Sequence, residues 1–235
     1  MHKTCDSLGD MQVVLVRHAH SEANAKGILS GRTPGVALSS KGIAQSQDLI
    51  SRLGNFKICE LRTSPLERCL QTVTPWWDAI GKKNNHGIEL KRDSNLIEVD
   101  YGLWSGKKLS SLSKKPLWKT VQSSPSAMYF PSGEGIAEVQ VRAMRAVHES
   151  TSIKRKGAVV LFSHGDVIKS IVASVLGMHL DDFQRIVIDP ASVTVLEFTA
   201  SKPRVLLLND SRSQLSDLLN APLPKKNLLG GGAGR

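Results

Sequence analysis

The chain has 235 residues, of which 40% are hydrophobic and 22% are charged, an ordinary composition for a globular protein. Its length suffices for one large α/β domain, and no apolar run approaches the roughly 20 residues that a membrane-spanning helix needs. The formal net charge of +10 favours an acidic partner. We rank a small phosphate ester above nucleic acid, because aromatic residues are few and no nucleic-acid module is recognised. Solvated lysine side chains are the alternative explanation of the charge.

The two ends of the chain differ in composition from its centre. Residues 1–10 lack the apolar segment of a signal peptide, so we interpret them as an N-terminal extension before a domain over residues 11–210. Residues 211–235 are polar and glycine-rich, which predicts a flexible tail. Three leucines in it are spaced to form one short docked helix: Leu215, Leu218 and Leu219.

The cysteines indicate the compartment. They are odd in number and lack metal-ligand spacing, so we expect reduced thiols in the cytoplasm: Cys5, Cys59 and Cys69.

Apolar runs and helical periodicity alternate along the chain. Strands are predicted over residues 13–16, 58–63, 88–91 and 159–162, and helices over residues 39–53, 64–80, 134–150 and 166–177. Ser39 and Ser64 are the expected N-caps, with Ile43 on the buried face of the first helix. Residues 107–127 predict an excursion over the sheet edge. Short connections favour antiparallel additions over residues 185–188, 193–198 and 204–208.

Two of the predicted strands end on histidine. Residues 13–16 lead into Arg17 and His18, and residues 159–162 lead into Ser163 and His164. Two parallel strands of one sheet place both histidines at the same edge, where open α/β sheets bind their ligands. Alone, each histidine would more often be a surface or core residue, so their pairing carries the argument.

Four motifs in a fixed order resemble the histidine phosphatase superfamily, also called the phosphoglycerate mutase-like family. The resemblance extends over residues 11–209. The motifs are Arg17-His18-x-x-Ser21-x-x-Asn24, Ser64-Pro65-Leu66-Glu67-Arg68 with Gln71-Thr72, Leu96-Ile97-Glu98 with Tyr101-Gly102-Leu103-Trp104-Ser105-Gly106, and Ser163-His164-Gly165. It implies a three-layer α/β/α sandwich, with a mostly parallel central sheet and an antiparallel edge strand.

The resemblance also implies a role for each matched residue. His18 is the nucleophile that forms phosphohistidine, and Arg17 and Arg68 bind the phosphate as planar, permanently charged forks. His164 is expected to be protonated against the phosphate, and Asn24 to help hold it. Gly165 completes the phosphate-binding set.

The acid loop contains two candidate acids, and the first motif differs from the family pattern at one position. By the match, Glu98 protonates the leaving group and then activates water, while Asp100 is the rival acid within reach. Ala19 stands where the family usually has glycine, from which we expect altered loop geometry at most. Glu134, Arg142 and Ser192 are expected to shape the pocket.

The implied function is hydrolysis of a phosphomonoester on a small phosphorylated metabolite, with no metal, cofactor, nucleic acid or membrane involved. The run 98–134 is similar to an actinobacterial subfamily of probable phosphatases or phosphomutases. Two alternatives stay open: a phosphomutase that uses the same intermediate, and a catalytically silent protein that binds phospho-ligands. The oligomeric state is also open, with a homodimer as one option.

Overall fold

The computed structural model describes residues 11–153, 155–199 and 202–221 of the chain. The strands are β1 (Met11–Arg17), β2 (Ile28–Leu29), β3 (Ile58–Thr63), β4 (Leu90–Arg92), β5 (Lys107–Lys108), β6 (Ala158–Ser163), β7 (Val193–Phe198) and β8 (Arg204–Asp210). The α-helices are α1 (Glu22–Ala25), α2 (Ser40–Leu53), α3 (Glu67–Trp76), α4 (Lys82–Asn84), α5 (Leu109–Leu112), α6 (Leu117–Ser123), α7 (Ile136–Thr151), α8 (Gly165–Val175) and α9 (Ser216–Asn220). One π-helical turn, η1 (Trp77–Gly81), and four 3-10 segments complete the elements: η2 (Ser94–Leu96), η3 (Gly102–Trp104), η4 (Pro125–Ala127) and η5 (Leu180–Arg185).

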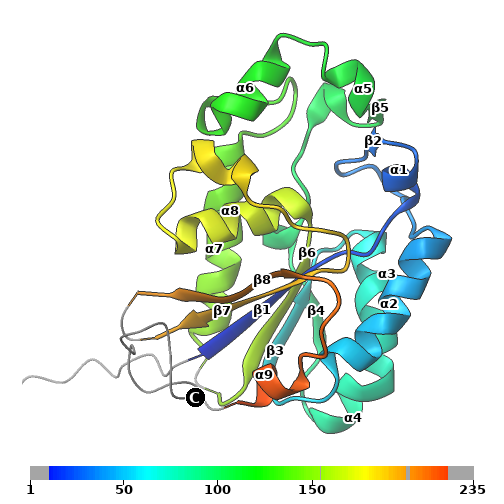
Figure 1. Ribbon diagram of the computed structural model, residues 1–235, viewed down its shortest axis with the longest axis vertical. Helices are drawn as coiled ribbons and strands as arrows, with labels where there is room; N and C mark the ends of the chain where they lie inside the picture. The colour runs from blue at the N-terminus through cyan, green and yellow to red at the C-terminus, as the bar shows by residue number, and fades with distance from the viewer. Residues whose placement is uncertain (1–10, 154, 200–201, 222–235) are drawn as a thin grey trace, which may run out of the picture.

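The central sheet has the strand order β4-β3-β6-β1-β7-β8 (Figure 1). β4, β3, β6 and β1 run parallel, whereas β7 and β8 are antiparallel. The predicted mostly parallel α/β sandwich is therefore confirmed, with two antiparallel strands at its edge. The strand expected over residues 185–188 is wrong, because η5 ends at Arg185 and the Ile188 carbonyl accepts a hydrogen bond from Arg17 Nη1 instead of a neighbouring strand.

Alternation along β1 produces the layers on either side of the sheet. Val13 and Leu15 pack with α7 and α8, while Val14 and Val16 pack with α2, α3 and α9. All four side chains are fully buried. Because successive side chains of a strand point to opposite faces, one apolar run builds two cores, and the helices lie on both sides of the sheet (Figure 1).

Helix α2 begins and ends where capping residues predict. Ser39 Oγ accepts a hydrogen bond from the Gly42 N–H at 3.2 Å, and Gly54 ends the helix with a φ of 60°. Ile43, however, is 55% exposed. The helix turns its Gly42 face inward, where a Cβ would lie 1.9 Å from the His20 carbonyl oxygen. This close approach decides which face is buried.

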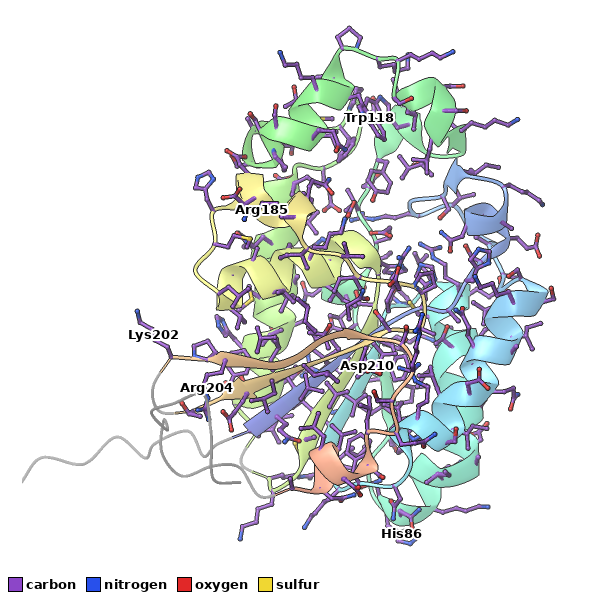
Figure 2. The ribbon with its side chains drawn as sticks, in the orientation of Figure 1. His86, Trp118, Arg185, Lys202, Arg204 and Asp210 are labelled. Atoms are coloured by element: carbon purple, nitrogen blue, oxygen red, sulfur yellow. The ribbon has the colours of Figure 1, made fainter. Side chains whose placement is uncertain are left out.

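A small cap lies above the carboxyl ends of the parallel strands (Figure 1). It consists of β5, α5, α6 and η4, and β5 pairs with β2. Trp118 of α6 (labelled in Figure 2) stacks on Trp104 with ring centroids 6.2 Å apart. The cap is the excursion that residues 107–127 predict, and the β2–β5 pair ties it to the segment after β1.

The first part of the predicted tail is packed rather than flexible. Leu215 and Leu219 are buried, and the Leu215 N–H donates to the Arg52 carbonyl at 2.7 Å. Burying two leucines outweighs the polar composition around them. The expectations for residues 1–10 and 222–235 fall outside the described residues. None of the described helices is both long and apolar enough to cross a membrane.

Candidate active site

The parallel pairing of β1 with β6 sets two histidines side by side. Arg17 lies opposite Ser163 in the register, and the His18 N–H donates to the Ser163 carbonyl at 2.9 Å. The rings of His18 and His164 follow directly, with centroids 5.1 Å apart and planes at 60°. The sheet edge thus brings together the two side chains that the strand pattern pairs.

His18 is held in one tautomer. Its Nδ1 lies 2.7 Å from the Ala19 carbonyl oxygen, which can only accept, so Nδ1 carries the proton and Nε2 keeps a free lone pair. Burial, together with the positive charges of Arg68 and Arg17, holds the pKa of His18 well below its usual value. The side chain is therefore a neutral imidazole at neutral pH, as a nitrogen nucleophile must be.

Two guanidinium groups flank the histidines. Arg17 donates from Nη1 to the Ile188 carbonyl at 2.6 Å, and Arg68 donates from Nη2 to the Gly31 carbonyl at 2.9 Å. Within the described part of the chain, the buried Nε atoms of both arginines have no hydrogen-bond partner. Unpaired buried donors are costly, and an anion that accepts from both would satisfy them. Gly165 permits the arrangement, because a Cβ there would lie 3.3 Å from Arg17 Nε.

His164 lies between Arg68 and Ser64. Arg68 Nη2 lies 3.2 Å from His164 Nδ1, which must accept because a guanidinium only donates, and Nε2 lies 2.7 Å from Ser64 Oγ. Burial and the charge of Arg68 keep the pKa of His164 well below its usual value. In the free protein His164 is therefore neutral, and its expected protonation against a bound phosphate stays a prediction.

Glu98 is a carboxyl group with a raised pKa, so that a large fraction of it is protonated near neutral pH. Burial and the nearby Asp166 carboxylate raise its pKa to about 7, against the opposing charge of Arg68. Its Oε1 accepts from the Val99 N–H at 3.0 Å, and its Oε2 lies 3.7 Å from His164 Nδ1. An acid of this pKa can donate a proton near neutral pH.

Three other predicted site residues are engaged differently. Asp100 accepts from the Gly102 N–H and lies 3.6 Å from Arg32 Nη1, and none of its hydrogen bonds or ion pairs among the described residues reaches a histidine. The Asn24 side chain accepts from the backbone N–H and Oγ of Ser21 in a capping box. Ala19 adopts an ordinary negative φ, and its N–H donates to Thr72 Oγ1 at 2.9 Å. Alanine thus fits without backbone strain.

Sequence reasoning missed several residues that shape the site. Ser64 is not the cap of α3, whose N-cap is Leu66, but a partner of His164. Tyr101 donates its hydroxyl to Asp166 Oδ2 at 2.8 Å, and Asp166 is one of the groups that raise the pKa of Glu98. Asp166 directly follows His164-Gly165 in the sequence, and this position could have indicated that it belongs to the site. Ser192, by contrast, is one of the residues expected to shape the pocket, and its buried Oγ has no partner within the described residues.

The donor atoms could also be read as a metal site. One ligand atom each from His18, Glu98 and His164 lie within 4.8 Å of one another. Arg17 and Arg68 occupy the same neighbourhood and repel a cation. The charge balance therefore favours an anion over a metal ion.

Known proteins resemble this chain in sequence and in fold. The chain is 28% identical over 201 residues to phosphoserine phosphatase 1 of Hydrogenobacter thermophilus, covering 85% of this chain and 92% of the relative. It is 25% identical over 193 residues to a probable phosphoglycerate mutase of Enterobacter sp. (strain 638), covering 81% and 86%. The fold matches a crystal structure of phosphoserine phosphatase from Entamoeba histolytica with a TM-score of 0.75 at 22% identity, covering 86% of this chain and 98% of that one. The family profile of the histidine phosphatase superfamily (branch 1) matches residues 13–211. The chain therefore belongs to the histidine phosphatase superfamily.

Proposed function

We propose that the protein hydrolyses phosphomonoesters in two steps through a phosphoryl group on His18. Nε2 attacks phosphorus, and the ester oxygen departs with the proton of Glu98. The Glu98 carboxylate then takes a proton from water as that water attacks the phosphohistidine. The second step releases inorganic phosphate and restores both residues.

Charge stabilisation in this proposal comes from three side chains. Arg17 and Arg68 offer the non-bridging oxygens their Nε–H groups, which have no partner among the described residues, and further guanidinium donors. A bound phosphate dianion would raise the pKa of His164, so that this histidine gains a proton and donates to an equatorial oxygen.

The single observation that carries the proposal is the hydrogen bond between His18 Nδ1 and the Ala19 carbonyl. It fixes the proton on the nitrogen away from the reaction and leaves Nε2 able to attack without prior deprotonation. The low pKa of His18 keeps the neutral form of the imidazole dominant at neutral pH.

Trapping the intermediate tests the mechanism. After rapid mixing with labelled substrate and an alkaline quench, an acid-labile phosphoryl group should map to the peptide that contains His18, and His18→Ala should be inactive. Label on another residue, or full turnover by His18→Ala, would refute the assignment.

The proposed substrate class rests on the proteins that this chain resembles, not on a particular contact in the site. Relatives of this chain include phosphoserine phosphatases, and one solved relative contains 3-phosphoglyceric acid. We therefore propose a small phosphorylated metabolite, with phosphoserine as the first compound to test in a screen. Release of inorganic phosphate supports a phosphatase, whereas recovery of an isomeric phosphate ester would support the mutase alternative. Binding without turnover, including of p-nitrophenyl phosphate, would indicate a silent binding protein.

Two proposals concern the setting of the enzyme. A cytoplasmic location is supported by Cys59 and Cys69, two buried thiols that form no disulfide within the described part of the chain. Cell fractionation tests it. A homodimer stays a proposal for light scattering to test.

A further inference from the structure

The loop that carries Glu98, residues 95–102, is held from behind by two arginines. The Glu98 carbonyl oxygen accepts from Arg32 Nε at 3.0 Å and from Arg142 Nη2 at 3.2 Å. Arg142 Nη1 also donates to the carbonyls of Asn95 and Ile97, at 2.8 and 2.6 Å. One guanidinium thus binds three carbonyls of the same short loop.

Glu134 joins the two arginines. Its Oε1 accepts from Arg32 Nη2 at 2.8 Å and from Arg142 Nη2 at 2.7 Å, and its Oε2 accepts from Arg142 Nε at 3.1 Å. The Asp100 N–H adds a further hydrogen bond to Oε1 at 2.8 Å. Burial alone would raise the pKa of Glu134, but the hydrogen bonds from Arg142 and Asp100 and the charges of the arginines lower it. Glu134 is therefore an ionised carboxylate.

We propose that Arg142, Glu134 and Arg32 form a clamp that positions the Glu98 carboxyl group for proton transfer. None of the three needs to touch the substrate, so they are positioning residues. The inference rests on the proposed role of Glu98 as the general acid.

The clamp acts through the backbone of Glu98. With its carbonyl fixed by two donors, the peptide that follows presents the Val99 N–H to Glu98 Oε1 at 3.0 Å. The other carboxyl oxygen then lies 3.7 Å from His164 Nδ1, beside the position that a phosphate would occupy. Proton transfer needs hydrogen-bond reach, so a small displacement of this loop removes the acid from the leaving oxygen.

A purely structural tie would give a different kinetic pattern from a positioning clamp. If the clamp only stabilises the fold, its loss lowers the amount of active enzyme and slows all esters alike. If it positions an acid, its loss slows esters whose leaving group needs a proton and spares those that leave as stable anions.

Single-turnover kinetics of Arg142→Met on an alkyl phosphate and on p-nitrophenyl phosphate distinguish the two. We expect phosphorylation by the alkyl ester to slow by about 10–100-fold, the cost of displacing a catalytic group by about an ångström. The p-nitrophenyl ester should be nearly unaffected. Arg142→Lys should recover only part of the loss, because an ammonium group restores the charge but not the planar fork. Glu134→Gln should show the same selectivity, and it provides the test if Arg142→Met does not fold.

Arg204→Met is the matched control. It also deprives a buried carboxylate, Glu197, of its guanidinium partner. Glu197 lies opposite Gln12 near the start of β1, whereas His18 follows the end of that strand, and Figure 2 shows Arg204 and Asp210 at opposite ends of β8. This variant should lose stability without any selectivity between the two esters.

Combining the clamp variant with Glu98→Gln separates the possible failures. If Arg142 acts through Glu98, the double variant should be no slower on the alkyl ester than Glu98→Gln alone. The clamp proposal would be wrong if the rate losses of Arg142→Met and Glu98→Gln multiply in the double variant, or if Arg142→Met slows both esters equally. Glu98 would remain the acid in either case. If Glu98→Gln itself shows no preference between the esters, the acid assignment fails and the clamp fails with it.

Discussion

Replacing Glu98 by glutamine should stabilise the protein at alkaline pH. Glutamine keeps an oxygen for the Val99 N–H but never ionises. The wild-type carboxyl group has a pKa of about 7 in the folded protein, against an ordinary value of 4.5. At 1.36 kcal/mol for each pH unit, this difference corresponds to about 3 kcal/mol.

The sign follows from proton uptake on folding. Between pH 4.5 and about 7, Glu98 is ionised in the unfolded chain but protonated in the folded protein. Because the folded state binds more protons, its stability falls as pH rises through this window and levels off above pH 7. The penalty is absent at low pH and complete at high pH. The variant escapes it throughout.

Urea unfolding of both proteins at several pH values measures the effect. The free energy of unfolding of Glu98→Gln should exceed that of the wild type by a margin that grows by about 2 kcal/mol between pH 5 and pH 8. Asp100→Asn, which removes a partly exposed carboxylate paired with Arg32, is the control on the same loop. A margin that stays flat or reverses sign would mean that Arg17 and Arg68 keep Glu98 ionised, and the reasoning from burial would be wrong.

Three further outcomes are expected. The wild-type kcat/KM for an alkyl phosphate should fall as pH rises through about 7, because Glu98 then loses its proton. Glu98→Gln should lower this kcat/KM by roughly 10²–10⁴-fold and abolish its pH dependence. A pH profile that is the same in the variant and the wild type would contradict the acid role. Activity should survive EDTA, and vanadate should inhibit as a pentacoordinate mimic, because two arginines neutralise the phosphate; a strict Mg²⁺ requirement would be incompatible with this site. Truncation after Asp210 removes the buried Leu215 and Leu219, so thermal or urea unfolding should show a loss of about 3 kcal/mol. The folded fraction should keep its kcat/KM, because α9 lies at the opposite end of the sheet from the cap (Figure 1).

Features that depend on neighbouring residues could be predicted from the sequence. The apolar runs before His18 and His164 predict two buried strands, and parallel pairing then requires the histidines to meet at one edge. Helix α2 likewise follows from Ser39 and Gly54, because a cap acts within one helical turn. In such cases the pattern and the physical cause lie in the same few residues.

Features that depend on distant backbone atoms could not be predicted. Ser64 fits a helix cap, but its hydroxyl bonds to His164, which lies 100 positions further along the chain. Arg142 reaches the carbonyls of Asn95 and Ile97, and every residue has a carbonyl, so the sequence gives no sign of which ones are bound. The prediction that Ile43 is buried is wrong for a similar reason, because the contact between Gly42 and His20 decides which face of α2 is buried.

The position of β6 between β3 and β1 governs when the enzyme can first work during its synthesis. Neither neighbour of β6 can pair with it before residues 158–163 have emerged from the ribosome, and the same segment delivers His164. A nascent or cleaved chain that stops short of this strand has His18 but no partner for it. If His164 takes part in catalysis as proposed, hydrolysis should begin only once most of the chain is made.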